Sequence, residues 1–115
     1  MRNKLLLLAL LALPATALAD TTLSFEVAAA DNNMAECLVW GPKFEKPFVL
    51  VVTGDTATLT SGGGVHVSMT KIGPDKYHGI FMLSGEKVDH TADVSARTLT
   101  IHENSRGCRW RAKAL

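Results

Sequence analysis

The chain has 115 residues, of which 12 are Lys or Arg, 11 are Asp or Glu and two are cysteine. This length predicts a single domain with a modest core. The nearly balanced charge creates no strong field toward nucleic acid or an anionic membrane surface, so neither is expected as a partner.

Residues 1–19 have the pattern of a bacterial secretory signal peptide. Arg2 and Lys4 form a positive start, the apolar run 5–13 follows, and Ala17-Leu18-Ala19 is a small-x-small cleavage site. Nine apolar residues are too few to span a membrane, which takes about 20, so this segment is interpreted as a cleaved leader and not as a membrane anchor. No membrane span is expected once the leader is removed.

We therefore predict a periplasmic or secreted protein, cleaved after Ala19, whose mature part 20–115 is a single β domain. Cleavage removes two of the twelve basic residues and none of the eleven acidic ones, so the formal net charge of the mature chain is −1.

The two cysteines lie near opposite ends of the mature chain, at Cys37 and Cys108. In an oxidising compartment they are natural disulfide partners, and the bond would tie the start of the fold to its end. The alternative is two free thiols or a metal-binding pair.

Apolar and polar residues alternate along most of the mature chain, with turn residues between the runs, which is typical of short half-buried strands. The strands are expected over 23–29, 37–40, 48–52, 56–60, 65–70, 77–83, 87–94, 98–102 and 107–113. The two-residue loop at 54–55 would pair Leu50 with Leu59 and Val52 with Ala57, which puts apolar residues on one face.

Eight or nine short strands joined mostly by hairpins predict an all-β fold. We expect a small antiparallel meander barrel with one disulfide, and a β-sandwich is the alternative. A barrel of this size would be filled by its own side chains, with at most a narrow mouth.

The last strand provides the first candidate surface. Cys108, Trp110 and Ala112 should face the core, while Arg109, Arg111 and Lys113 should face water. With Arg106 they form a basic stripe along which a polysaccharide or a phosphate group could lie. The alternative, which we favour, is a charged outer face that keeps the strand soluble and discourages edge pairing.

Strand 77–83 is the second candidate surface, because it is apolar on both faces. Tyr77, Phe81 and Leu83 share one face, and Ile80 and Met82 share the other. Either the strand is buried under another layer, which we favour, or it exposes a binding patch that includes Tyr77 and Phe81.

Dedicated chemistry is not expected. The histidines recur every 12 residues, at 66, 78, 90 and 102, but His66 and His102 should point outward and His90 inward, so we expect no metal site. No serine sits in a nucleophile elbow, and the glycine run 62–64 lacks the other residues of a phosphate-binding loop. We expect neither a cofactor nor enzymatic activity.

Three segments resemble the periplasmic C-type lysozyme inhibitors: Cys37-x-x-x-Gly41, the apolar run 48–52 and Ala57-Thr58-Leu59-Thr60. The resemblance covers about 25 residues plus the position of Cys108. It implies a small eight-stranded barrel, an exported chain and a disulfide from an early strand to the C-terminal region. That family's inhibitory loop is rich in Ser and Gly and carries an aromatic residue. The nearest stretch here, 61–66, lacks the second serine and the tyrosine, so the resemblance assigns no inhibitory residue.

Together these features predict a non-enzymatic binding protein whose partner is a protein or an envelope component, with lysozyme inhibition as the sharpest version. A second interpretation is a carrier for a small apolar ligand, held in a barrel mouth lined by Trp40, Phe81 and Trp110. A third is an enzyme.

Overall fold

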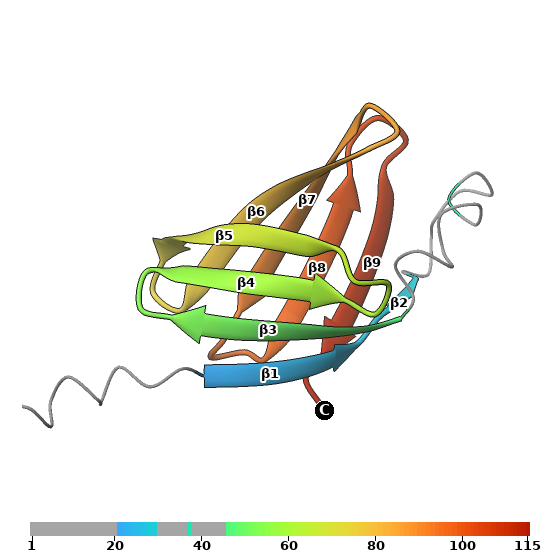
Figure 1. Ribbon diagram of the computed structural model, residues 1–115. Helices are drawn as coiled ribbons and strands as arrows, with labels where there is room; N and C mark the ends of the chain where they lie inside the picture. The colour runs from blue at the N-terminus through green and yellow to red at the C-terminus, as the bar shows by residue number, and fades with distance from the viewer. Residues whose placement is uncertain (1–20, 30–36, 38–45) are drawn as a thin grey trace, which may run out of the picture.

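The computed structural model describes residues 21–29, Cys37 and residues 46–115 (Figure 1). Antiparallel strands follow one another in a single sheet of order β1-β3-β4-β5-β6-β7-β8-β9-β2. The strands are β1 Thr21–Glu26, β2 Ala28–Ala29, β3 Pro47–Thr53, β4 Thr56–Ser61, β5 His66–Gly73, β6 Lys76–Leu83, β7 Glu86–Asp93, β8 Thr98–Glu103 and β9 Cys108–Lys113.

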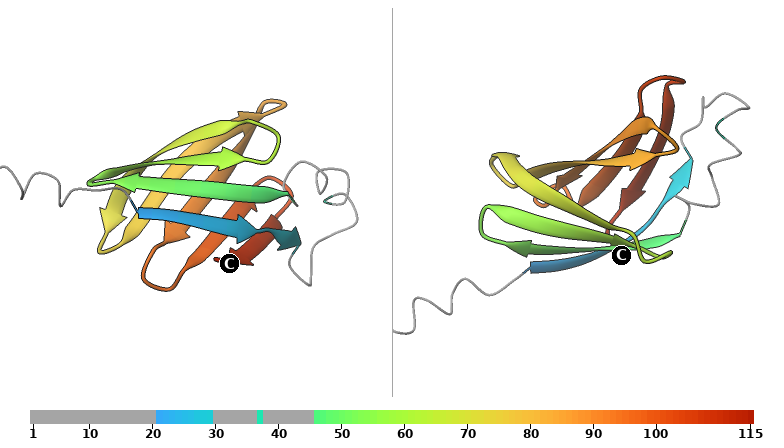
Figure 2. Two further views of the ribbon diagram at one scale, coloured as in Figure 1. Left: turned by 60° about the horizontal axis from the view of Figure 1, so that its bottom comes forward. Right: turned by 45° about the horizontal axis from the view of Figure 1, so that its top comes forward.

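The sheet bends into a nearly closed barrel because the N-terminal segment contributes a strand to each end of the sheet. β1 pairs with β3, and after a break at Val27 the short β2 pairs with β9. An isolated bridge between Phe25 and Ala114 adds a further link. Figure 2 shows β1 continuing the layer of β3–β5, and β2 leading from that layer to β9. The prediction of an all-β meander barrel is therefore confirmed.

The β3–β4 hairpin has the predicted register. Leu50 pairs with Leu59 and Val52 with Ala57, and the loop between the strands is Gly54-Asp55. Gly54 adopts a φ of 64°, which a glycine reaches without the steric cost that other residues incur. Tyr77 fixes this turn from inside, because its hydroxyl donates a 2.6 Å hydrogen bond to the carbonyl of Gly54.

The corner between β5 and β6 depends on a glycine. The register shifts between Lys71 and Gly73, and past His78 strand β6 diverges from β5 (Figure 1). Where the strands cross, a Cβ added to Gly79 would collide with the carbonyl oxygen of Ser68 and lie 2.9 Å from Cγ1 of Val67. Only a residue without a side chain allows this approach.

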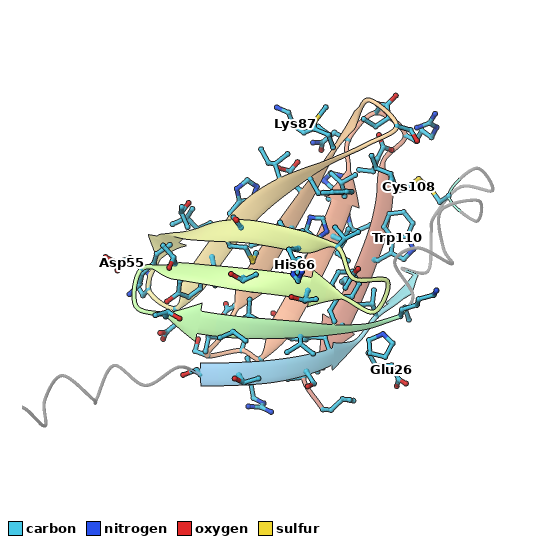
Figure 3. The ribbon with its side chains drawn as sticks, in the orientation of Figure 1. Glu26, Asp55, His66, Lys87, Cys108 and Trp110 are labelled. Atoms are coloured by element: carbon cyan, nitrogen blue, oxygen red, sulfur yellow. A yellow bond between two sulfur atoms is a disulfide. The ribbon has the colours of Figure 1, made fainter. Side chains whose placement is uncertain are left out.

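The core consists of the inward faces predicted from alternation. It holds Leu23, Phe25, Val27, Phe48, Leu50, Ala57, Leu59, Val67, Met69, Tyr77, Val88, Ala92, Leu99, Ile101, Trp110 and Ala112, together with both cysteines. Figure 3 shows Cys108 and Trp110 on β9. The predicted disulfide joins Cys37 to Cys108, 71 residues apart, with a Cα–Cα distance of 5.5 Å.

Several local predictions need correction. The strand expected over 23–29 is divided at Val27, because the chain changes its pairing partner there. Val65 was expected on an inward face but is exposed, since β5 begins only at His66. Of the strand expected at 37–40, only Cys37 is among the described residues, and it is not in a strand.

Full burial of strand 77–83, which we favoured, is wrong for its outer face. Ile80 and Met82 are 46% and 56% exposed. The inward residue Tyr77 is buried, whereas Phe81 and Leu83 are partly buried against the core. No second layer covers the outer face of β6 within the described residues, so β6 is half-buried like its neighbours.

Candidate functional site

The basic side chains of β9 face outward as predicted. Arg109, Arg111 and Lys113 are exposed and alternate with the buried residues of the same strand. Residues two apart on a strand lie about 6.6–6.8 Å apart, so the three positions form a straight row of cations. Whether this row can act as a site depends on the strands beside it.

The register of β7, β8 and β9 places polar side chains next to this row. Asp89 pairs with His102, which pairs with Arg109. One step along the strands, Thr91 pairs with Thr100, which pairs with Arg111. The outer face of these strands is therefore a grid of hydroxyl, imidazole and guanidinium groups.

Two depressions lie on this face. The first has a volume of about 550 Å³ and is lined by His78, Asp89, Thr91, Thr100, His102, Arg109 and Arg111. The second has about 400 Å³ and is lined by Glu26, Thr98, Leu99, Thr100, Arg111, Ala112 and Lys113. They share Thr100 and Arg111, and we call the two together the β9 groove.

The carboxylate in the first depression is engaged by neighbouring side chains. Asp89 Oδ1 lies 2.8 Å from His78 Nε2, and Asp89 Oδ2 accepts a 2.7 Å hydrogen bond from Asn104. Burial alone would raise the pKa of the Asp89 carboxyl, but these hydrogen bonds and the charges of His78 and Lys87 hold it below its ordinary value. Asp89 is thus an ionised anchor that orients His78.

Two cations of the row are available to a ligand. Among the residues that the structure describes, no carboxylate lies within ion-pair distance of Arg111 or Lys113. A guanidinium presents a planar fork of donors that fits a carboxylate, sulfate or phosphate group, and the threonine hydroxyls beside it can donate or accept. The groove is thus suited to recognising an anion.

Arg106, the fourth member of the predicted stripe, lies outside the groove in the turn between β8 and β9. Its Nη1 lies 3.9 Å from Oε2 of Glu103, and its backbone N–H donates to the same carboxylate at 2.9 Å. Arg106 therefore interacts with Glu103 within the β8–β9 turn.

Glu103 is a buried carboxylate that the sequence analysis did not single out. It is fully buried and accepts hydrogen bonds from the amide and hydroxyl of Ser105 and from the amide of Arg106. Burial alone would raise the pKa of Glu103, but these donors outweigh it and hold the pKa below its ordinary value. The carboxylate serves to fix the β8–β9 turn.

The aromatic candidates lie in or against the core. Tyr77 is buried with its hydroxyl bonded to Gly54, and Phe81 is partly buried against the core. Trp110 is 0% exposed, so it fills the barrel interior. Trp40, the other residue expected at an apolar mouth, lies outside the described residues.

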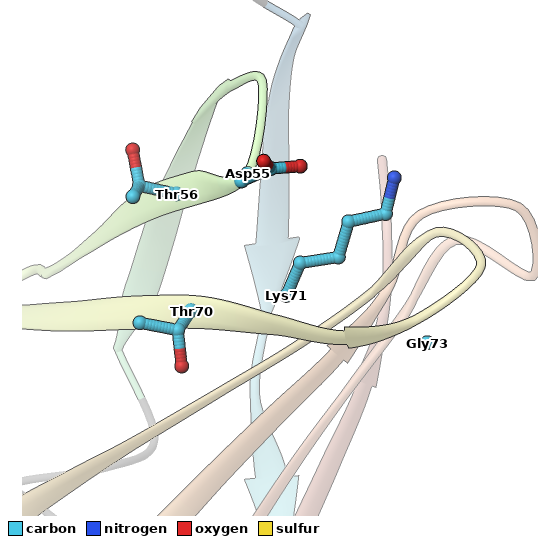
Figure 4. Close-up of a pocket in the computed structure, with 5 residues that line it drawn as sticks. All are labelled: Asp55, Thr56, Thr70, Lys71 and Gly73. Atoms are coloured by element: carbon cyan, nitrogen blue, oxygen red, sulfur yellow. The ribbon is translucent and has the colours of Figure 1, made fainter.

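A further depression of about 480 Å³ lies between the β3–β4 turn and the end of β5, lined by Asp55, Thr56, Thr70, Lys71 and Gly73 (Figure 4). Its two charged residues have opposite signs, and a 2.9 Å bond runs from the amide of Lys71 to the carbonyl of Asp55. It lacks the concentration of like charge found in the β9 groove.

The loop 61–66, whose sequence comes nearest to the inhibitory motif of the lysozyme inhibitors, is closed by its own hydrogen bonds. The hydroxyl of Ser61 accepts a 3.0 Å bond from the amide of Val65, whose carbonyl in turn accepts one from the amide of Ser61 at 2.8 Å. At the base of the loop, Thr60 Oγ1 lies 2.9 Å from Nδ1 of His66, which Figure 3 shows at the start of β5. The Ser61 hydroxyl is therefore used within the turn.

The histidines face as predicted. His66 is exposed, His102 is on the outer face and His90 is buried. Within the described ranges, no three His, Cys, Asp or Glu side chains are placed to hold a metal ion. Both cysteines are in the disulfide.

In residues 21–29, 37 and 46–115 there is no helix of the length and hydropathy that a membrane crossing requires. The comparisons with known proteins found no matching family model, no matching curated protein and no matching solved structure.

Proposed function

We propose that this chain is a non-enzymatic binding protein, periplasmic or secreted, that recognises a protein or an envelope component through the β9 groove. The observation that carries the proposal is the row of exposed cations along two connected depressions. Most of the other side chains that line the groove carry hydroxyl or imidazole groups, which can hydrogen-bond polar groups of a ligand.

The location outside the cytoplasm is supported by the disulfide and by the leader pattern of residues 1–19. Disulfides form and persist in oxidising compartments and are rare in the cytosol of mesophiles. The non-enzymatic assignment is supported by the oxidised state of both cysteines, which removes the only candidate thiolate nucleophiles.

The test is capture of a partner from periplasmic extract by the immobilised mature protein. We expect a partner that binds wild-type protein and is released by salt, because contacts between exposed charges are screened. Arg111→Ser should abolish capture, whereas Lys71→Ser, which removes an equal charge outside the β9 groove, should not. A partner captured equally by all three proteins would refute the assignment to the groove.

The sharpest version of the proposal is inhibition of a C-type lysozyme. The barrel and the Cys37–Cys108 disulfide agree with what the resemblance to lysozyme inhibitors implies. The cleft of a lysozyme also carries two catalytic carboxylates, and guanidinium groups pair well with carboxylates.

A cell-wall lysis assay tests this version with stoichiometric mature protein. Inhibition that is lost in Arg111→Ser would support the groove as the inhibitory surface. Inhibition that survives Arg111→Ser but is lost when the 61–66 loop is altered would place the contact on the loop. No inhibition would leave the wider binding proposal to the capture experiment.

A further inference from the structure

The cations of the β9 groove are arranged in a line, which distinguishes them from a scattered charged surface. Arg109, Arg111 and Lys113 occupy alternate positions on one strand, so their side chains leave the same face in succession. The two depressions meet at Thr100 and Arg111, so the row of cations lies along both of them. A hollow edged by a row of evenly spaced cations fits a linear ligand with repeated negative charges.

The acidic side chains beside the row are mostly engaged elsewhere. Asp89 binds His78 and Asn104. Asp93, on the outer face of β7, accepts bonds from the hydroxyl of Ser95 and the amide of Ala96. Glu26 lines the second depression and weakens the attraction there. Arg111 and Lys113 nevertheless remain open to an anion, because no carboxylate of the described residues lies within ion-pair distance of either.

The uncharged groups favour a saccharide over the other linear polyanions. Thr91, Thr98 and Thr100 place hydroxyls along the groove, where they can bond sugar hydroxyls. Among the described residues, no Phe, Tyr or Trp lines either depression, and these are the residues on which single-stranded nucleic acids stack their bases. The exposed apolar side chains Ile80 and Met82, of the kind that protein interfaces bury, are not among the lining residues.

We propose that the β9 groove binds a linear anionic polysaccharide, which lies along β9 with its acidic groups on Arg111 and Lys113. This inference rests on the proposed function and specifies the ligand of the same site. The threonines beside the row hydrogen-bond the sugar rings and hold the chain in the groove.

The experiment measures binding of the mature protein to polygalacturonate and heparin, which carry carboxylate and sulfate groups, with neutral dextran and single-stranded DNA as comparisons. We expect binding to one or both acidic polysaccharides, weakened by salt, and none to dextran. Arg111→Ser/Lys113→Ser should weaken it about tenfold or more, because two charge-assisted contacts are removed.

The matched control is Lys71→Ser/Lys76→Ser, which removes the same charge from exposed positions that line neither depression of the β9 groove. It should bind within about twofold of wild type, as expected for distant surface charges under screening. Equal weakening by both double variants would overturn the proposal, because net charge alone would then explain binding. Equal affinity for DNA would overturn the choice of a saccharide.

The outcomes also separate this inference from the proposed function. If neither polysaccharide binds but Arg111→Ser abolishes capture of a partner from extract, the groove remains a binding site and the polysaccharide proposal is refuted. If polysaccharide binding and partner capture both survive removal of the cations, the groove itself is excluded.

Discussion

His90 should make the stability of the barrel depend on pH in a range where few other groups titrate. The imidazole is 1% exposed, its Nδ1 lies 3.3 Å from the carbonyl oxygen of Val88, and its ring centroid lies 6.3 Å from that of Phe48. Burial lowers the pKa of His90 from 6.5 to about 4, although the hydrogen bond to Val88 opposes the shift. The folded protein therefore holds the neutral imidazole.

Proton linkage gives the direction and the size of this change in stability with pH. Between about pH 6.5 and pH 4 the unfolded chain binds a proton at His90 that the folded chain does not, so the free energy of unfolding falls as the pH falls. From pH 7.5 to pH 4.5 the expected loss is about 2–3 kcal/mol. The carboxyls of Asp89, Asp93 and Glu103, whose pKa values are lowered from 3.8, 3.8 and 4.5, contribute mainly below this range.

Urea unfolding of the mature protein at pH 7.5, 6.5, 5.5 and 4.5 measures the effect. His90→Gln should lose most of this pH dependence, whatever it costs in stability at pH 7.5. His66→Gln, which removes an exposed imidazole, should keep it. A His90→Gln variant whose stability falls as steeply as that of wild type would refute the assignment of the linkage to this histidine.

Three further predictions concern the barrel itself. Replacing both Cys37 and Cys108 by Ala should lower the free energy of unfolding by up to about 4 kcal/mol, which is the chain-entropy value for so long a loop. Thiol titration of the unfolded, unreduced wild type should find no free thiol. Gly79→Ala should impair folding or lower the melting temperature markedly, because the carbonyl oxygen of Ser68 obstructs the new methyl group. Gly73→Ala, which has open space around its Cα, should have a mild effect. Equal effects of the two substitutions would contradict the close crossing of β5 and β6 at Gly79. Trp110→Ala should cost about 3–5 kcal/mol in a denaturant melt, as for other fully buried aromatics, and a loss below about 1 kcal/mol would contradict its place in the core.

The sequence was sufficient where structure depends on local alternation. The two-residue loop at 54–55 set the register that pairs Leu50 with Leu59, and the pleat placed Trp110 and His90 inward. It was insufficient where the barrel changes direction. The break at Val27 and the crossing at Gly79 depend on contacts with strands distant in sequence, which alternation does not encode.

The candidate site was predicted only in part for the same reason. Arg109, Arg111 and Lys113 could be placed on an outer face from their own strand. Asp89, His78 and His102 join them only through the register of β6 to β9, so three separate hairpins had to be aligned first. The sequence pattern did not distinguish Glu103 from other carboxylates, and its burial depends on the β8–β9 turn folding back over it.

The claim that the β9 groove is the binding surface is tested most directly by mapping amide chemical shifts of the ¹⁵N-labelled mature protein as it binds the captured partner. We expect the largest changes to fall on β8 and β9, around Thr100 and Arg111, and to be absent in Arg111→Ser. Changes concentrated on the Ser61–Gly64 turn or around Ile80 and Met82, with β8 and β9 unaffected, would contradict it.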